Sequence, residues 1–551
     1  HPLMTMSFDY NTIKSNIIPH KVEGTVYAYG TAGFRTKAHL LDSVMYKVGI
    51  LAALRSKKLN GSTIGVMITA SHNPEEDNGV KLVDPRGEML EQSWETYATK
   101  FANANDGESL AEAIEQVVTA QEINLETPAA VVYAHDTRPS CPELVKCLES
   151  GLNVSGAKAT GYGLKTTPML HYIVRCINTA GTNDAYGEPT EEGYYKKLSE
   201  AYKTAVAGKP RLSTLHVDCG NGVGAPKLAE FVKYLPEDVL SLKIINGDIH
   251  TEGKLNKDCG ADYVKTRQQA PLGTEIAPGD RFCSFDGDAD RIVFYYVDNN
   301  NVFKLLDGDK IAGLAAMFIM ELVQDAGIDT LKVGVVQTAY ANGSSTNYLT
   351  NVLKVPVSCV PTGVKHLHHE AEKYDIGVYF EANGHGTVLF SPEALNTINT
   401  IEAKTPAQQQ AINQLKAVTD VINQTVGDAI SDMLLVETIL TNRQWGPDEW
   451  DQAYTDLPNR LVKVVVADRT IFKTTNAERE LVEPEGLQEK INAHVAKYSH
   501  GRSFVRASGT EDAVRVYAEA ATRSETDELA YKVSLLVYNE AGGVGKPPMM
   551  P

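Results

Sequence analysis

One unit recurs along the chain and limits which folds are possible. It consists of a short apolar run rich in β-branched residues, then a polar loop, then a helical stretch. The apolar runs lie at residues 63–68, 129–134, 213–218, 332–338 and 376–380. Such runs, bounded by turn residues, predict buried strands. Because strands that alternate with helices build layered sheets, we predict α/β domains with mixed sheets.

The remaining segments differ from this unit in their periodicity. Apolar residues near helical spacing predict a helix at 39–59, and helical segments are also expected at 93–120 and in the Gln-, Ala- and Asn-rich stretch 406–427. In contrast, residues 461–466 and 513–520 alternate with period two. This predicts a last α+β domain whose antiparallel sheet is open on one face and covered by helices on the other. The Gly- and Pro-containing tail, 542–551, is expected to be disordered.

A chain of 551 residues is too long for a single hydrophobic core. Composition changes at a Gly-, Asn- and Glu-rich segment near 182–195 and again at Trp445-Gly446-Pro447. We therefore predict four domains. Their ranges are 1–185, 186–303, 304–445 and 446–551.

The charge of the chain restricts its partners. Lys and Arg number 52 against 70 Asp and Glu, a net charge of −18. Such a surface repels nucleic acid and anionic membranes, so neither is expected as a partner, and an anionic ligand needs a local cluster of Arg, Lys or metal. Seven Cys without a CxxC pair fit a reducing cytosol. No apolar run approaches a membrane span, and no obligate protein partner is evident.

The strand at 63–68 ends at Thr69-Ala70-Ser71-His72-Asn73-Pro74. Small Ala70 leaves the Ser71 hydroxyl accessible, and Pro74 with Asn78-Gly79 is expected to keep the loop tight. Serine is a weak nucleophile at neutral pH, so it needs a neighbouring base or must be delivered as an activated form such as a phosphate ester. The alternative is an ordinary surface turn, and these residues alone do not decide between the two.

Asp286-Gly287-Asp288-Ala289-Asp290-Arg291 carries three carboxylates at alternate positions. In an extended loop they would point to one side, and three hard oxygen donors suit Mg²⁺. An EF-hand is excluded, because Arg291 stands where that loop needs Gly and Val297 where it needs Glu. A solvated acidic loop is the alternative. The metal site is favoured because the apolar strand 292–297 follows at once and unpaired carboxylates would crowd its start.

A second polar loop, Arg506-Ala507-Ser508-Gly509-Thr510-Glu511, is followed by Arg515. Its turn exposes N–H groups and hydroxyls, and its arginines supply forked donors, so it suits a phosphate dianion. The alternative is a turn with salt-bridged arginines. A third loop, Glu381-Ala382-Asn383-Gly384-His385, offers hydrogen-bonding groups suited to sugar hydroxyls. The pattern Gly220, Gly222, Ala225 could indicate a dinucleotide site, but a structural turn is favoured.

Taken together, the four loops at residues 69–74, 286–291, 381–385 and 506–511 resemble those of the α-D-phosphohexomutase superfamily, in the same order along nearly the whole chain. Most members have Gly where Phe380 stands and Ser where Asn383 stands. In these two positions the sequence is similar to the eukaryotic branch that acts on N-acetylglucosamine phosphates.

The resemblance implies four domains around a central cleft. It implies that Ser71 rests as phosphoserine and binds one Mg²⁺ together with Asp286, Asp288 and Asp290. The implied reaction interconverts N-acetylglucosamine 6-phosphate and 1-phosphate, a small-molecule hexosamine phosphate, through a glucosamine-type 1,6-bisphosphate, and feeds UDP-N-acetylglucosamine synthesis. Physically, a metal neutralises charge on the phosphoryl group while the protein aligns donor and acceptor.

The resemblance also implies roles for the other loop residues. Lys81 matches the candidate acid/base, Arg35 and His72 match neighbours of the phosphoserine, and Arg291 would balance the carboxylates. The sugar would contact Glu381, Ala382, Asn383 and His385, and the non-reacting phosphate would contact Arg506, Ala507, Ser508, Gly509, Thr510 and Arg515.

Three rival functions remain. One is a phosphoglucomutase or phosphomannomutase with a wider sugar pocket, and another is an inactive relative that only binds sugar phosphates. The third is a phosphatase with an Asp-x-Asp nucleophile, although Asp290 occupies the fifth position, where such enzymes usually carry Thr or Val.

Overall fold

The structure is a computed structural model that describes residues 8–509 and 511–551. It divides the chain into two compact units. The first contains the chain up to Asp307 together with Asn383–Thr387 and Ile412–Pro447, and the second contains Gly308–Ala382, Val388–Ala411 and Asp448–Pro551. None of the helices in these described ranges combines the length and the apolar character that crossing a lipid bilayer requires.

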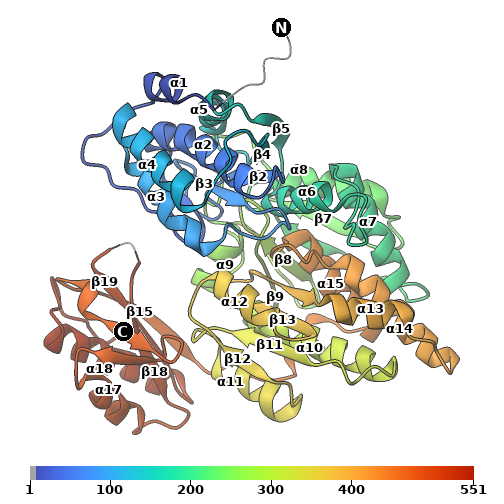
Figure 1. Cartoon of the computed structure of the whole chain (residues 1–551). Coiled ribbons are helices and arrows are strands. Elements are labelled where there is room, and N and C mark those ends of the chain that lie inside the picture. The colour runs from blue at the N-terminus through green and yellow to red at the C-terminus, as the bar shows by residue number, and fades with distance from the viewer. Residues whose placement is uncertain (1–7, 510) are drawn as a thin grey trace. The chain divides into compact units, whose positions relative to one another are not determined.

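The first unit begins with a five-stranded mixed sheet in the order β1-β3-β2-β4-β5 (Figure 1). Strands β2, β4 and β5 run parallel, whereas β3 is antiparallel to β2 and to β1. This confirms the predicted α/β class with mixed sheets. The strands are β1 (Phe34–Lys37), β2 (Ile64–Ile68), β3 (Asp77–Val83), β4 (Ala130–His135) and β5 (Lys158–Leu164).

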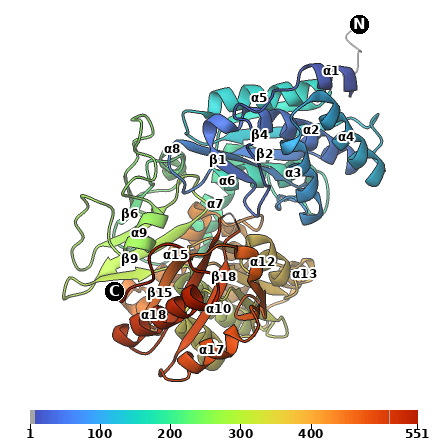
Figure 2. The same cartoon turned by 90° about the vertical axis from the view of Figure 1, so that its left-hand side faces the viewer.

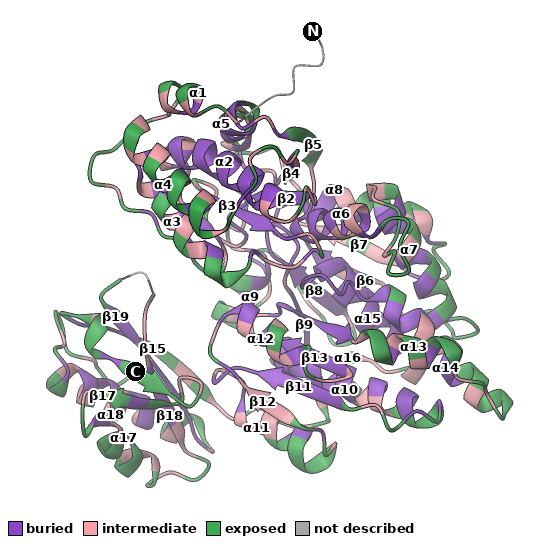
Figure 3. Ribbon diagram, in the orientation of Figure 1, coloured by how far each residue is buried: buried purple, intermediate pink, exposed green. Residues whose placement is uncertain are grey.

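Helices cover both faces of this sheet, which explains why β2 is apolar at every position. Alternate residues of β2, such as Ile64 and Val66, pack in the main core with α2 and α5. Met67, on the opposite face, packs against Leu170 and Val174 of α6. Figure 3 shows β2 and most of α2 as buried. The helices are α1 (Tyr10–Ser15), α2 (Asp42–Lys58), α3 (Glu95–Asn103), α4 (Gly107–Ala120), α5 (Cys141–Val154) and α6 (Thr167–Thr179).

The helical region predicted at 93–120 is confirmed, and it forms two helices because Asp106 caps the second one by accepting the Ser109 N–H at 2.7 Å. One local prediction in this region was wrong. The Asn78-Gly79 pair is part of β3 rather than a turn. Gly79 allows close strand approach, since a Cβ there would lie 2.3 Å from the Phe34 carbonyl oxygen.

The second sheet of the first unit has the order β10-β9-β8-β6-β7. Strands β7, β6 and β8 run parallel. Strand β9 runs antiparallel to β8, and β10 runs antiparallel to β9. Its elements are α7 (Glu191–Ala205), β6 (Leu215–Asp218), α8 (Gly224–Phe231), β7 (Leu242–Ile245), α9 (Ala261–Arg267), β8 (Arg281–Phe285), β9 (Ile292–Val297) and β10 (Phe303–Leu306). Helix α15 (Ala429–Arg443) returns to this unit and is almost wholly buried.

The third sheet has the order β12-β11-β13-β14, with β12, β11 and β13 parallel. Helices α10 and α12 pack on β11 and β13. The elements here are α10 (Gly308–Asp325), β11 (Val333–Gln337), α11 (Gly343–Asn347), β12 (Val357–Cys359), α12 (Val364–Ala371), β13 (Ile376–Phe380), β14 (Gly386–Phe390), α13 (Pro392–Thr400), α14 (Pro406–Val421) and α16 (Pro447–Asp451).

The fourth sheet, β15-β19-β18, is antiparallel throughout, as the period-two pattern predicted. Val464, Val505, Val514 and other residues of one face pack against α17 and α18 (Figure 2). On the other face, Phe504 and Tyr517 pack against residues 339–340, so this face is only partly open. The elements are β15 (Asn459–Val465), β16 (Lys473–Thr475), β17 (Glu480–Glu483), α17 (Leu487–Val495), β18 (Arg502–Ala507), β19 (Ala513–Glu519) and α18 (Arg523–Glu540).

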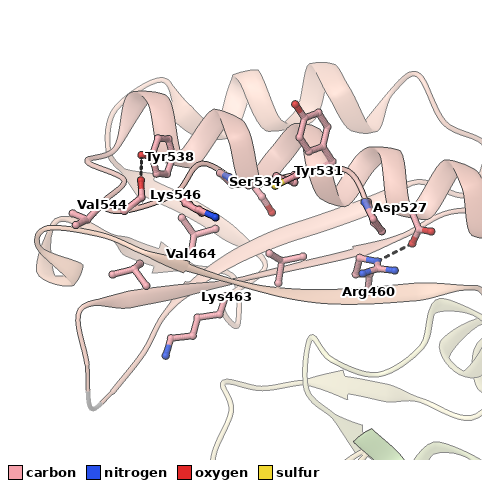
Figure 4. A pocket seen from close by; sticks show the side chains of 15 residues that line it. Arg460, Lys463, Val464, Asp527, Tyr531, Ser534, Tyr538, Val544 and Lys546 are labelled. Carbon is pink, nitrogen blue, oxygen red and sulfur yellow. Dashed lines mark hydrogen bonds and ion pairs between the residues drawn. The ribbon is translucent and has the colours of Figure 1, made fainter. Parts of the chain in front are cut away.

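The tail prediction was also wrong, because residues 542–551 lie against β15 and α18 (Figure 4). The Val544 N–H donates to the Val465 carbonyl at 3.0 Å, and the Tyr538 hydroxyl donates to the Gly545 carbonyl. Backbone hydrogen bonds to an edge strand therefore hold this end, which its composition did not indicate.

Three of the sheets place a polar loop at the same point of their topology. In each, a parallel strand ends and a short loop leads to the neighbouring strand, β2 to β3, β8 to β9 and β13 to β14. These connections carry Ser71, the three aspartates and Glu381, respectively. Ligands of α/β sheets bind at the carboxyl ends of the strands, so each sheet offers its functional loop where such sites form.

Candidate active site

Ser71 follows β2 and is only 2% exposed. Its hydroxyl donates a 2.6 Å hydrogen bond to Oδ2 of Asp286, which lies 215 residues later in the chain. A solvent-facing turn would leave this hydroxyl in water. The structure instead buries the Ser71 hydroxyl against the first carboxylate of the aspartate loop.

Asp286, Asp288 and Asp290 form a buried cluster in which a ligand oxygen from each lies within 4.8 Å of the others. The loop is not extended as predicted but turns tightly. The Ala289 N–H donates to the Asp286 carbonyl at 3.1 Å, and Ala289 has a φ of 60°. Oδ1 of Asp286 accepts the N–H groups of Asp290 and Arg291 at 3.0 and 3.1 Å. The carboxylates therefore converge because the chain wraps around Asp286.

The electrostatics of this cluster fit a divalent cation. Burial and the neighbouring Asp290 raise the pKa of Asp286 well above its usual range, and the same causes raise the pKa of Asp288 to about 6. Oδ1 of Asp288 and Oδ1 of Asp290 are buried and have no hydrogen-bond partner among the described residues. Unpaired buried carboxylate oxygens are costly, and a hard cation such as Mg²⁺ would satisfy them.

Asp290 is the exception among the three. Burial acts against its charge, but His385 and Lys81 outweigh this and lower its pKa. Nδ1 of His385 lies 2.8 Å from the Asp290 carbonyl oxygen, so the ring is tied to the aspartate loop. Lys81 is buried on β3 opposite Met67 of β2, the strand that leads to Ser71.

Two predicted neighbours of the serine, Arg35 and His72, are also close to this cluster. Burial, then Arg291 and Arg35, lowers the pKa of His72 to about 3, so the ring is neutral near pH 7. Burial, then Arg291, lowers the pKa of Arg35. Nε of Arg35 and Nδ1 of His72 have no hydrogen-bond partner among the described residues. Arg35 and Arg291 lie close enough to affect each other's charge, and Arg35 has a spare N–H donor, so a phosphate group is favoured at this position.

A pocket of about 970 Å³ lies beside the serine loop, but neither Ser71 nor the three aspartates line it. Its lining includes five acidic residues, Glu75, Glu76, Glu252, Asp258 and Asp262. Such a lining repels a phosphate, so this pocket is not assigned to the substrate.

The predicted sugar loop belongs to both units. Oδ1 of Asn383 accepts the His385 N–H at 3.0 Å, and the Gly384 carbonyl accepts the Ile292 N–H at 3.2 Å. The φ of Gly384 is 94°, and a Cβ there would lie 2.0 Å from the Ile292 carbonyl oxygen. Residues 383–385 are therefore held against the strand that follows the aspartates. Glu381 and Ala382 are part of the second unit, where the Ala382 carbonyl accepts the Gly308 N–H at 3.2 Å.

The predicted phosphate loop lies in the second unit, between β18 and β19. Arg506 stands directly opposite Arg515, and Arg515 stands opposite Lys463 of β15. These three residues, the basic row, cross three adjacent strands on one face of the sheet. Like charges that face each other across strands repel, so the row favours an anion.

Acidic residues neutralise the basic row in this structure. Nε of Arg506 donates to Glu478, and Oε1 of Glu511 lies 2.8 Å from Nζ of Lys463 and 4.0 Å from Arg515. The salt-bridged arginines expected under the alternative interpretation are therefore also observed. Next to the row, Ala507 ends β18, the Ser508 N–H donates to the Ala513 carbonyl at 2.9 Å, and Gly509 is exposed. The predicted site residue Thr510 lies outside the described residues.

Sequence reasoning missed several residues of these sites. Thr167 donates to Oδ2 of Asp288 at 2.7 Å from the first turn of α6, a position marked only by an ordinary helix-start signal. Lys463 joins the basic row through strand register, which the alternating pattern does not specify.

The Gly220–Ala225 pattern has a structural use, as favoured. A Cβ at Gly222 would lie 2.3 Å from the Gly287 carbonyl oxygen, and the Val223 N–H donates to that oxygen at 3.2 Å. This loop packs against the back of the aspartate loop.

Family models match nearly the whole chain in sections. Models of the phosphoglucomutase/phosphomannomutase alpha/beta/alpha domain I match residues 39–108 and 94–183, and the model of the C-terminal domain of the same families matches 461–536. Phosphoacetylglucosamine mutase AMG1 domain II matches 184–293, and domain III matches 307–445. The sheets, the serine loop and the aspartate loop are thus those of an α-D-phosphohexomutase.

Individual relatives narrow the assignment to one family within this superfamily. The phosphoacetylglucosamine mutase of Sus scrofa is 54% identical over 98% of this chain and 99% of its own length. The crystal structure of Aspergillus fumigatus N-acetylphosphoglucosamine mutase with GlcNAc-6P and magnesium is 57% identical, with a TM-score of 0.93 over 96% of this chain and 98% of that one. A serine-to-alanine variant of the A. fumigatus enzyme with glucose 1,6-bisphosphate is 56% identical, with a TM-score of 0.93 over 98% of this chain and all of that one. The chain belongs to the phosphoacetylglucosamine mutase family.

Proposed function

We propose that this chain interconverts N-acetylglucosamine 6-phosphate and N-acetylglucosamine 1-phosphate and that Ser71 carries the phosphoryl group. One observation carries the proposal. The Ser71 hydroxyl lies 2.6 Å from Asp286 in a buried cluster of three carboxylates, two of which keep oxygens without a partner among the described residues. A serine ester and a divalent cation complete such a cluster.

Asp286, Asp288 and Asp290, together with the Ser71 ester, are the residues that would hold one Mg²⁺. When bound, this ion neutralises charge on the phosphoryl oxygens and so favours phosphoryl transfer. The A. fumigatus relative was crystallised with magnesium. Thr167 orients Asp288 through its 2.7 Å hydrogen bond, and the two N–H groups on Oδ1 of Asp286 hold that carboxylate in place.

The reaction proceeds in two transfers. In the first, the bond between Ser71 Oγ and phosphorus breaks while a bond forms to the free hydroxyl of the sugar phosphate, giving a 1,6-bisphosphate. Lys81, buried beside Asp288 and Asp290, is the residue proposed to supply the proton to Ser71 Oγ and to recover one from the sugar hydroxyl. After the bisphosphate reorients, the reverse transfer returns a phosphoryl group to Ser71. Arg35 and neutral His72 would donate to its oxygens.

The other predicted contacts remain part of the proposal. Glu381, Ala382, Asn383 and His385 would bind the sugar, and Arg506, Ala507, Ser508, Gly509, Thr510 and Arg515 the phosphate that does not react. The alignment of three cations in the basic row supports the second assignment, because like charges that face each other across strands favour an anion. Glu478 and Glu511, which pair with the row in this structure, would give way to the phosphate.

A phosphatase with an Asp-x-Asp nucleophile is disfavoured by the surroundings of Asp286. The contacts of its carboxylate are internal: Oδ1 accepts two N–H groups, and Oδ2 accepts the Ser71 hydroxyl and lies 4.0 Å from Nε of Arg291. A carboxylate held in this way is a poor attacking group.

We also propose four domains, 1–185, 186–303, 304–445 and 446–551, which correspond to the four main sheets except that β10 of the second sheet extends to Leu306. It also includes a cytosolic location, in keeping with seven free cysteines. The substrate is a small hexosamine phosphate, and no nucleic acid, membrane or obligate protein partner is included.

The test compares two sugar phosphates on the wild-type chain. We expect turnover of N-acetylglucosamine 1-phosphate to exceed that of glucose 1-phosphate at equal concentration, and peptide mass spectrometry to find phosphate on Ser71. Equal rates would overturn the substrate assignment in favour of a phosphoglucomutase or phosphomannomutase. An unmodified Ser71 in an active enzyme would overturn the phosphoserine mechanism.

A further inference from the structure

The backbone of Ser71 adopts a conformation that needs external support. Its φ is 51°, in the left-handed region that residues with a Cβ rarely adopt. The neighbouring turn does not supply this support, since its backbone hydrogen bond runs from the Asn73 N–H to the Ala70 carbonyl and bypasses Ser71. Left-handed residues of this kind persist only where surrounding groups hold them.

Arg138, from the loop after β4, supplies one set of contacts. Its side chain is fully buried, and its Nη2 donates to the carbonyl oxygens of Ser71 and Asn73 at 3.1 and 3.0 Å. Its Nη1 donates to the carbonyls of Pro74 and Asp77. A single guanidinium therefore binds three carbonyls of the serine loop and one at the start of β3, which no other side chain has enough donors to do.

Asp136 connects this guanidinium to the other side of the Ser71 peptide. Its Oδ2 accepts Nε of Arg138 at 3.2 Å and the Thr69 hydroxyl at 2.7 Å. The Thr69 oxygen in turn accepts the Ser71 N–H at 3.1 Å. Both the N–H and the carbonyl of Ser71 are thereby linked to one carboxylate.

Asn256, from the loop between β7 and α9, binds the same carbonyls from a second direction. Its Nδ2 lies 2.8 Å from the Ser71 oxygen and 3.2 Å from the Asn73 oxygen. Gly287 makes room for this contact, because a Cβ there would lie 2.5 Å from the Ser71 carbonyl oxygen and 2.8 Å from Nδ2 of Asn256. The aspartate loop and the serine loop can meet only with glycine at this position.

We propose that Arg138 and Asn256 are positioning residues for the phosphorylated serine, an inference that rests on the function proposed above. Neither contacts the Ser71 hydroxyl. Both hold the carbonyls of Ser71 and Asn73, so they fix the direction in which Oγ points toward Asp286. Phosphoryl transfer requires Ser71 Oγ to be in line with the acceptor in both half-reactions. Loss of the hydrogen bonds from Arg138 or Asn256 should therefore lower kcat and leave the binding of the sugar phosphate unchanged.

Asn256 offers the sharper test, because its side chain is only half-buried, so we expect the fold to tolerate its replacement. For Asn256→Ala we expect kcat to fall about tenfold, equivalent to about 1.4 kcal/mol of barrier, with KM for N-acetylglucosamine 1-phosphate within about twofold. Asn256→Asp should lose more, on the order of a hundredfold, because the isosteric carboxylate removes both donors and faces two carbonyl oxygens. A packing role would give the opposite order, since Asp preserves the volume of Asn.

Arg138→Lys is the second variant, and Arg281→Lys is its matched control. Arg281 is also buried, but it pairs with Glu437 at 2.8 Å at the end of β8 remote from the aspartates. Melting temperatures should fall in both, whereas kcat should fall tenfold or more only in Arg138→Lys. Ser71 phosphate content should be measured in every variant, because a loosened serine should also exchange its phosphate less completely.

Two results would overturn the inference while the wild-type chain turns over normally. They are an Asn256→Asp variant as active as Asn256→Ala, or a kcat loss in Arg138→Lys no greater than in Arg281→Lys. Absence of mutase turnover by the wild-type chain would instead overturn the proposed function itself, together with this inference.

Discussion

The aspartate cluster of the first unit and the basic row of the second differ in how their charge is treated. The three carboxylates are buried, repel one another and keep two oxygens without a partner among the described residues. The basic row is partly exposed, and Glu478 and Glu511 already neutralise it. Lys81, Arg291 and His385 lie near the first site but leave those two oxygens without a hydrogen-bond partner among the described residues, whereas acidic side chains pair with each cation of the second site.

This difference separates two kinds of binding. A buried cluster whose oxygens lack partners among the described residues is preorganised for a cation that stays in place, and its groups act on the transition state. A neutralised row must exchange its acidic partners for an incoming phosphate, which suits a group that binds, leaves and binds again in another orientation. Changes at the first site should therefore lower kcat, and changes at the second should mainly alter KM.

The largest effect is expected at Ser71. Ser71→Ala removes the group that carries the phosphoryl group, so kcat should fall at least on the order of 10³-fold while the circular dichroism spectrum stays unchanged. Ser199→Ala, which removes another buried hydroxyl on α7, is the matched control and should keep full activity. Normal turnover by Ser71→Ala would show that the first site does not act on the transition state, so the proposed difference between the two sites would be wrong.

Asp288→Asn should produce opposite effects on activity and on stability. The substitution removes one of three crowded charges, so metal affinity and kcat/KM should fall roughly 10- to 100-fold. In the metal-free protein the same change relieves repulsion between buried carboxylates, so the melting temperature should rise. Differential scanning fluorimetry with EDTA and with MgCl₂ measures both. A lower melting temperature for Asp288→Asn than for the wild-type chain in EDTA would show that repulsion between the carboxylates does not destabilise the metal-free protein.

The two sites also differ in how far the sequence predicted them. Ser71 follows an apolar run, and the aspartates stand at alternate positions directly before one, so local pattern was enough to select both as candidates. Their 2.6 Å contact spans 215 residues and depends on how two sheets pack, and no local pattern encodes that. The same holds for Asn256, whose loop has no distinguishing composition. For the basic row, two arginines were recognisable, but Lys463 was not, because register is a property of strand pairing.

Turn chemistry was the least reliable local signal. Asn78-Gly79 is a strong turn pair, yet β1 and the carbonyl of Thr69 approach Gly79 so closely that the pair is used for strand packing. The composition of the tail after Gly542 predicted disorder, but backbone hydrogen bonds to the edge strand β15 and the residues that follow it hold the tail in place. In both cases a tertiary contact outweighed a local preference.

Arg506→Lys tests the exchange site. Lysine keeps the charge but loses the fork, so KM for the sugar phosphate should rise about tenfold, with kcat within about threefold. Arg460→Lys is the matched control, because Arg460 lies on the helix-covered side of the same sheet and pairs with Asp527 at 2.8 Å. A kcat loss without a KM change would mean that the basic row acts on the transition state in the same way as the aspartates.

The smallest effect is expected at Glu478, which competes with phosphate for Arg506. Glu478→Gln keeps an acceptor for the Thr362 N–H, to which Glu478 is bonded, but removes the charge that Arg506 must leave. Because partly exposed ion pairs contribute little, KM should fall only about threefold, and inhibition by inorganic phosphate should strengthen by a similar factor. In Arg506→Lys the same substitution should have a smaller effect, since the two side chains share one interaction. A rise in KM would show instead that Glu478 holds Arg506 in its binding position, so that the row is preorganised like the aspartate cluster.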